Sequence, residues 1–376
     1  MLNIKYIESA MLKMGLSQAA LAEYCKVSRE AVSNWMTGES MPRPGKLADL
    51  AEILKLRVEQ LFAASEVAEP VVAYRMRNNR AVSGTAKEAG EEVGRHLQQL
   101  LPLTGSTTLF EPPHMREPSL DETAVRAAAA AVRASLKLAP TDVLTCKHIF
   151  ELFHGFGAFL VPVFWGGDKV GHENAMSVYL PQSKSSWVVF NMGCRQDDFK
   201  YWLAHEYGHC LTLHELQGDD GETFSEKFAQ HLLFPDELAA QVLESIRCSK
   251  QPRAVANGIA KKYDVSIITV VSAADRIAKA RNEQVTGLAT GPFYGDWKKA
   301  GKTAPTAAQS IFGTNTPTAA EYIAKSEEVF STPVFRALAK WQQENGGRSP
   351  AFIASALNVS LVDANELSYA LWEPAV

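Results

Sequence analysis

The chain lacks any apolar run long enough to cross a bilayer, and no charged and then apolar leader stands at its N-terminus. A membrane-spanning helix needs about 20 consecutive apolar residues, and export needs such a leader. We therefore expect a soluble, cytoplasmic protein without a membrane partner. Its five cysteines are odd in number and unpatterned, which favours a reducing compartment and argues against a disulfide framework.

A large excess of charge of one sign is also missing. The 38 Lys and Arg residues face 42 Asp and Glu residues, which leaves a net charge of −4. This balance excludes a protein that binds nucleic acid through bulk positive charge alone. The chain does have apolar residues, at 46% of 376 positions, and this length and content allow two or three domains with buried cores.

The most informative segment is HEYGH at 205–209. His205 and His209 share one face of a helix because they are four residues apart. Two such imidazoles can bind one zinc ion, and Glu206 between them can act as the general base. Zinc in a peptidase needs a third protein ligand and a position for water. The alternative is a pair of surface histidines on an amphipathic helix.

The flanking segments fit a metal site. The run SSWVVFNMG (185–193) alternates as a strand does, and DDFKYWLA then predicts a helix that leads into the motif. We expect the stretch from Trp187 to Asn191 to be an edge strand beside the metal, where an extended peptide could pair with it. After the motif, GDDGETFSEKFAQHLLFP predicts a second helix that ends at Pro235.

The second helix carries two acids, Glu222 and Glu226, four residues apart on one face. We assign Glu222 as the third metal ligand and Glu226 as the acid that accepts a hydrogen bond from a ligand histidine. Other acids of the same segment compete for the first role, and a solvated surface charge is the alternative for Glu226. His214 and His231 are weaker candidates for stabilising an oxyanion.

Residues 120–240 resemble the ImmA/IrrE family of metallopeptidases. The matching pieces are ETAVRAAAAAVRASLKL with Arg133, FHGFGAFLVPV, WVVFN, FKYWLAHEYGHCL and ETFSEKFAQHLLFP. Two departures are present. Ser225-Glu226 stands where Ala-Asn or Ala-Asp is usual in the family, and His214 falls one place later than the family's frequent trailing histidine.

This resemblance implies an α+β, zincin-like domain. It also implies that His205, His209 and Glu222 hold Zn²⁺ and that Glu206 is the general base. The expected partner is a protein substrate, often a repressor, which is cut under stress or during phage infection.

The N-terminal stretch LSQAALAEYCKVSREAVSNW predicts two helices, capped by Ser17 and Ser28, around a turn at Lys26. It resembles the Cro/repressor-like (XRE) helix-turn-helix family over residues 1–64, which implies binding to double-stranded operator DNA. In such a module the second helix enters the major groove and the first contacts the backbone. The alternative is a helical protein-binding module. A homodimer is the expected assembly, since two copies double the phosphate contacts. The predicted DNA contacts are Gln18, Lys26, Ser28, Arg29, Glu30, Ser33 and Asn34.

The signature of this turn, Leu-Ala, four residues, Val-Ser at 21–28, recurs with Ile in place of Leu at 259–266 and 353–360. Three helix-turn-helix-like units are therefore predicted. In the second and third units apolar residues follow the serine, so we expect those faces in cores or partner interfaces.

We predict a multidomain chain that combines an all-α helix-turn-helix bundle, an α+β peptidase domain and a mostly α C-terminal region. The function predicted is a DNA-binding transcription regulator with a zinc endopeptidase that cleaves a partner or itself. The alternative is a regulator whose peptidase-like domain senses a ligand without proteolysis. The expected parts are 1–64 (DNA binding), 65–118 (connector), 119–240 (peptidase), 241–283 (helix-turn-helix-like), 284–318 (loop or linker) and 319–376 (helical).

Overall fold

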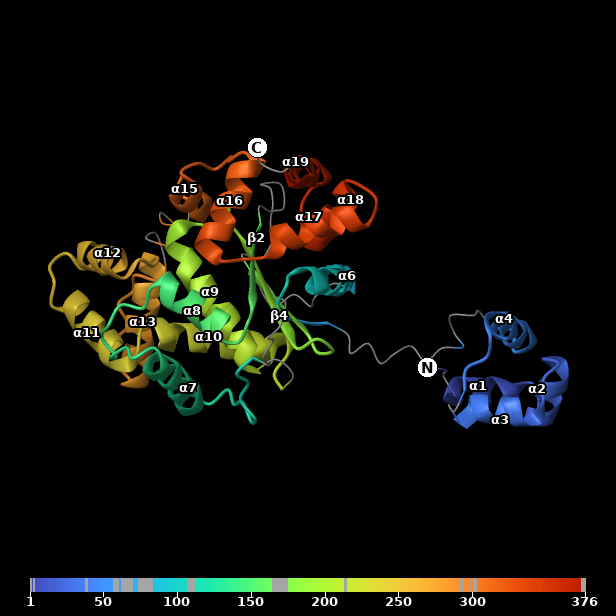
Figure 1. Ribbon diagram of the computed structural model, residues 1–376. Helices are drawn as coiled ribbons and strands as arrows, with labels where there is room; N and C mark the ends of the chain where they lie inside the picture. The colour runs from blue at the N-terminus through green and yellow to red at the C-terminus, as the bar shows by residue number, and fades with distance from the viewer. Residues whose placement is uncertain are drawn as a thin grey trace. The chain divides into compact units, whose positions relative to one another are not determined.

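The chain forms two compact units, Met1–Glu69 and Pro70–Val376, and each is described by itself (Figure 1). No described helix is both long and apolar enough to cross a membrane. The computed structural model describes residues 2, 4–37, 40–56, 61, 70–73, 84–106, 112–163, 175–212, 215–290, 294–295, 297, 299 and 303–372.

The first unit is a helical bundle around a small apolar core that includes Leu21, Val32 and Trp35. The predicted caps are confirmed: the hydroxyls of Ser17 and Ser28 each accept a hydrogen bond from the backbone N–H three residues later, at 3.1 Å. The helices are α1 (Ile4–Lys13), α2 (Gln18–Tyr24), α3 (Arg29–Thr37) and α4 (Pro44–Ile53).

The second unit contains a four-stranded sheet. Its order is β1-β3-β4-β2, in which β2 runs parallel to β4 and the other neighbours are antiparallel. The strands are β1 (Val71–Ala73), β2 (Phe159–Val163), β3 (Ala175–Leu180) and β4 (Ser185–Asn191).

The prediction that Trp187–Asn191 is an edge strand is wrong. Strand β4 pairs with β2 on one side and β3 on the other, so its backbone has no place for an added peptide. All of its residues except Asn191 are buried, because side chains cover both faces of the sheet.

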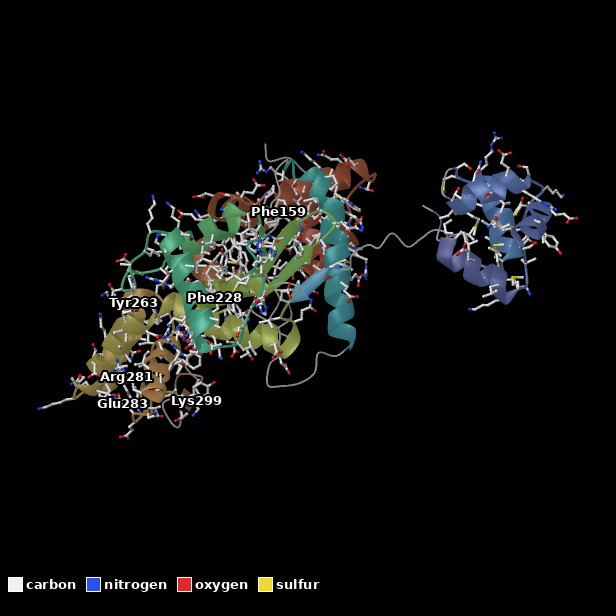
Figure 2. All side chains as sticks on the ribbon, turned by 90° about the horizontal axis from the view of Figure 1, so that it is seen from below. Phe159, Phe228, Tyr263, Arg281, Glu283 and Lys299 are labelled. Carbon is white, nitrogen blue, oxygen red and sulfur yellow. The ribbon has the colours of Figure 1, made fainter. Side chains whose placement is uncertain are left out.

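Helices cover both faces of this sheet (Figure 1). One apolar cluster contains Val188 of β4 and Phe228, and the other contains Val189 and Phe159; Figure 2 labels both phenylalanines. The helical elements are α6 (Gly84–Leu100), the 3₁₀ helix η1 (Leu101–Leu103), α7 (Glu122–Ser135), α8 (Cys146–Gly155), α9 (Gln196–Thr212), α10 (Gly218–Leu233), α11 (Asp236–Arg247), α12 (Pro252–Tyr263), α13 (Ile267–Ala280), α15 (Ala307–Phe312), α16 (Ala319–Phe330), α17 (Val334–Glu344), α18 (Pro350–Leu357) and α19 (Leu361–Trp372).

Segments predicted to be separate parts belong to this one unit. Helix α6, from the predicted connector, and helices α17 to α19 share one apolar cluster with the sheet. Part of the predicted linker is ordered as α15, where the backbone N–H groups of Ala307 and Ala308 donate to the carbonyls of Cys194 and Met192 at 2.9 and 2.8 Å. This docking was not predicted, because the composition of 284–318 indicates a loop and carries no signal of a long-range contact.

The predicted repeat of the turn is present in three places. Lys26, Asp264 and Asn358 each adopt the left-handed conformation, with φ of 52°, 49° and 51°. The valine after each donates to the alanine carbonyl five residues earlier, at 2.9, 3.1 and 3.1 Å. Helix α13 after the second turn is largely buried, as predicted, whereas α19 exposes Leu361 and Val362.

Candidate metal centre and helix-turn-helix domain

Helices α9 and α10 cross in close contact at Gly208. A Cβ placed on Gly208 would lie 2.9 Å from Cα of Ser225 and 3.1 Å from its Oγ, so a side chain there would push the helices apart. Ser225 is fully buried. This crossing places Glu222, about one turn before Ser225, against the face of α9 that carries the two histidines.

Three predicted ligands converge at this crossing. His205 Nε2 lies 3.1 Å from His209 Nε2 and 3.4 Å from Glu222 Oε2, and His209 Nε2 lies 3.1 Å from Glu222 Oε1. Ligand atoms about 2.0–2.1 Å from a tetrahedral zinc ion stand roughly 3.3 Å apart. Among the described residues, these three form the group of His, Cys, Asp and Glu side chains that could hold a metal ion.

The three side chains are buried, with exposed fractions of 0% for His205, 6% for His209 and 8% for Glu222. Burial raises the pKa of Glu222, but the adjacent imidazoles outweigh this and lower it to about 2. Burial lowers the pKa of His209, and Glu222 together with Glu206 raises it to a larger extent. This low pKa keeps the Glu222 carboxylate ionised, as a metal ligand has to be.

The donor set fits a zinc ion. Both oxygens of Glu222 are buried, and neither accepts a hydrogen bond of normal geometry within the described part of the chain. A buried carboxylate needs a strong partner to offset its desolvation. Two imidazoles and one carboxylate are the protein ligands found in many catalytic zinc sites.

Glu206 follows the first histidine and is 2% exposed. Its Oε2 accepts a hydrogen bond from the Ser177 hydroxyl at 2.7 Å. Ser177 belongs to β3, so this bond joins the sheet to α9. Ser177 was not predicted as a site residue, since a serine within an apolar strand carries no local signal of such a role.

Glu226 is exposed on α10. Exposure alone assigns this carboxylate neither to solvent nor to a histidine. The assignment of Glu226 as the histidine's partner therefore stays a prediction.

Other residues in or near the motif lie in the protein core or outside the described part of the chain. Tyr207 is buried and its ring stacks on Phe228 at 6.1 Å between centroids. Cys210 is buried, and burial raises the pKa of its thiol. His214 lies outside the described residues.

The buried His231 lies in a polar network away from the three ligands. It is nine residues after Glu222 on α10, which corresponds to roughly 13 Å along the helix. Its Nε2 lies 2.7 Å from Glu122 Oε1, and Arg276 Nη1 lies 2.9 Å from its Nδ1. Arg276 also pairs with Asp236 at 2.5 Å. This network joins α7, α10, α11 and α13, and its partners, far apart in sequence, gave no local signal.

The predicted DNA contacts lie at the start of α2, in the turn after it and along α3. Asn34 is half-buried, and its backbone carbonyl accepts a hydrogen bond from the Thr37 hydroxyl at 3.3 Å. The remaining predicted contacts are exposed: Gln18, Lys26, Ser28, Arg29, Glu30 and Ser33.

Residues 7–61 match the family model described as Helix-turn-helix. The N-terminal unit is a helix-turn-helix domain. This match supports a DNA-binding transcription regulator. In the helix-turn-helix domain, α2 and α3 are the two helices of the motif, and the exposed start of α3 is the part that reads bases in such modules. A search of curated proteins and a search of solved structures each returned no match.

Proposed function

We propose that the second unit is a zinc-dependent endopeptidase with a zincin-like core, of the ImmA/IrrE type, in a chain that regulates transcription. The observation that carries the proposal is the convergence of His205, His209 and Glu222 within 3.1–3.4 Å. The neighbouring Glu206 supports it, because a site that only binds metal needs no general base. The substrate class is a protein partner, such as a repressor, or the chain itself.

The ligands, the general base and Ser177 have separate roles in the proposed reaction. His205, His209 and Glu222 would hold the ion, which when bound polarises the scissile carbonyl and acidifies a water molecule. Glu206 would accept a proton from the attacking water and return it to the leaving amine nitrogen. Ser177 holds the Glu206 carboxylate in place through its hydroxyl.

The other candidate function is a sensor that uses the same fold without proteolysis. It shares the DNA-binding domain and the metal ligands, but it assigns no role to Glu206. Replacing Glu206 therefore separates the two functions.

The experiment combines metal analysis with a cleavage assay. Purified chain is analysed for zinc and incubated with the proteins encoded beside it, and the products are identified by mass spectrometry. We expect about one zinc per chain and cleavage by the native protein but not by Glu206→Gln. If the chain binds zinc but cleaves neither itself nor any protein encoded beside it, the sensor function would be favoured.

A further inference from the structure

Strand β3 is flanked on its outer side by β1, the short strand at the start of the second unit. The two strands are antiparallel, with Ala73 opposite Ser177, Val72 opposite Val178 and Val71 opposite Tyr179. The inner side of β3 pairs with β4. Residues 71–73 of the chain therefore occupy the edge of β3.

This edge lies beside the candidate general base. Ser177, opposite Ala73, is the residue whose hydroxyl donates to Glu206 at 2.7 Å. Opposed residues of antiparallel strands have Cα atoms about 4.5–5.5 Å apart. An extended peptide that pairs with a sheet edge is held by main-chain hydrogen bonds. A peptide that pairs with β3 opposite Ser177 would therefore lie next to Glu206.

We propose that β1 occupies the place of the substrate on β3, so that a protein substrate reaches the site by displacing this strand. The inference rests on the proposed function and names its regulation. An extended substrate would pair with β3 in the direction that β1 now takes. Strand β1 is the first described strand of the second unit and directly follows the helix-turn-helix unit in sequence.

Helix α6 holds the start of β1 in place. A Cβ on Gly94 would lie 2.6 Å from Cβ of Pro70 and 3.4 Å from Cγ1 of Val178. Pro70 immediately precedes β1, so the absence of a side chain at Gly94 lets this end of the strand pack against α6. Gly94→Ala should push Pro70 away and loosen β1. Gly258→Ala in α12 is the matched control, since a Cβ there would meet open space.

A reversible disulfide tests the proposal directly. Val72→Cys combined with Val178→Cys places two thiols on opposed residues, whose expected Cα separation lies within the range that a disulfide spans. Oxidation should lock β1 onto β3, and reduction should release it. The same purified full-length protein then serves as its own folding control.

The probe is a short peptide hydroxamate, which binds zinc through its hydroxamate and pairs with a strand through its peptide. Titration calorimetry should show binding at least about tenfold weaker to the oxidised double variant than to its reduced form, with equal zinc content. The native protein, treated identically, should show no such difference. Gly94→Ala should bind the probe more tightly than the native protein, and Gly258→Ala should match the native protein.

Equal affinity of the oxidised and reduced double variant, with the disulfide verified by mass spectrometry and zinc retained, would overturn the role of β1. Absence of both zinc and hydroxamate binding in every form would instead contradict the proposed function, and this inference with it.

Discussion

The hydroxyl of Ser177 on β3 donates a hydrogen bond to Oε2 of Glu206 on α9, across a distance of 2.7 Å. Both residues are buried. The bond fixes the orientation of the candidate general base relative to the sheet. None of the three predicted metal ligands takes part in it.

Ser177→Ala should lower the rate of peptide hydrolysis while zinc content stays unchanged. Hydrogen-bond partners of metal ligands typically contribute about ten- to a hundredfold to activity, and we expect a loss of similar size for a partner of the general base. We expect the loss in kcat, because the substrate contacts persist, and partial recovery in Ser177→Thr, which keeps a hydroxyl. Steady-state kinetics and metal analysis of both variants check this; full activity of Ser177→Ala would show that Glu206 needs no such support.

Gly208→Ala should destabilise the second unit, because its Cβ would lie 2.9 Å from the backbone of Ser225. Overpacking of this kind costs about 1–3 kcal/mol. Gly258→Ala, with open space around the added Cβ, should be neutral or stabilising by up to about 1 kcal/mol. Urea unfolding measures both changes. Equal stability of the two variants would mean that the helices can separate at no cost.

The buried His231 of the polar network should make the free energy of unfolding depend on pH. Burial lowers the pKa of His231, and Arg276 lowers it further, so the folded protein binds this proton less readily than the unfolded chain. As pH falls below the unfolded value of about 6.5, the unfolded state takes up the proton first and stability decreases. Once the pH is below the folded pKa, this contribution levels off.

His231→Gln should therefore reduce the slope of unfolding free energy against pH just below about pH 6.5. Chemical denaturation at several pH values measures the slope. An unchanged slope in the variant would assign the pH dependence to other groups.

Arg29→Ala should weaken specific DNA binding by about 1–3 kcal/mol and relax the preference at one base pair. Lys26→Asn should weaken binding to all sequences alike, since a lysine at this position is expected to contact phosphate. Asparagine is chosen because residue 26 has a φ of 52°, which asparagine tolerates. Gel shifts on the promoter of its own gene, at several salt concentrations, check both changes. Unchanged binding by Arg29→Ala would favour a protein-binding module.

Local patterns predicted much of this fold. The helical spacing of HEYGH predicted that His205 and His209 share one face, and the capping serines predicted where α2 and α3 begin. The eight-residue signature of the turn predicted three turns of the same geometry. These features depend on neighbours within about one helical turn, so the sequence carries them directly.

Features that depend on distant segments escaped prediction. Whether β4 lies at an edge depends on which strands join it, and β2 and β3 both do. The pairing of β1 with β3 and the contact of Ser177 with Glu206 arise only when segments about 30 to 105 residues apart meet. The exposure of Glu226 likewise follows from how α10 packs, which spacing alone left open.

Zinc content measured alongside proteolysis, in three variants and the native chain, tests the central claim most directly. Glu206→Gln should retain about one zinc per chain and lose cleavage, because only the base is removed. Glu222→Gln should lose the metal, and Glu226→Gln should lose much less of it. Full proteolysis by Glu206→Gln, or full zinc content in Glu222→Gln, would contradict the account.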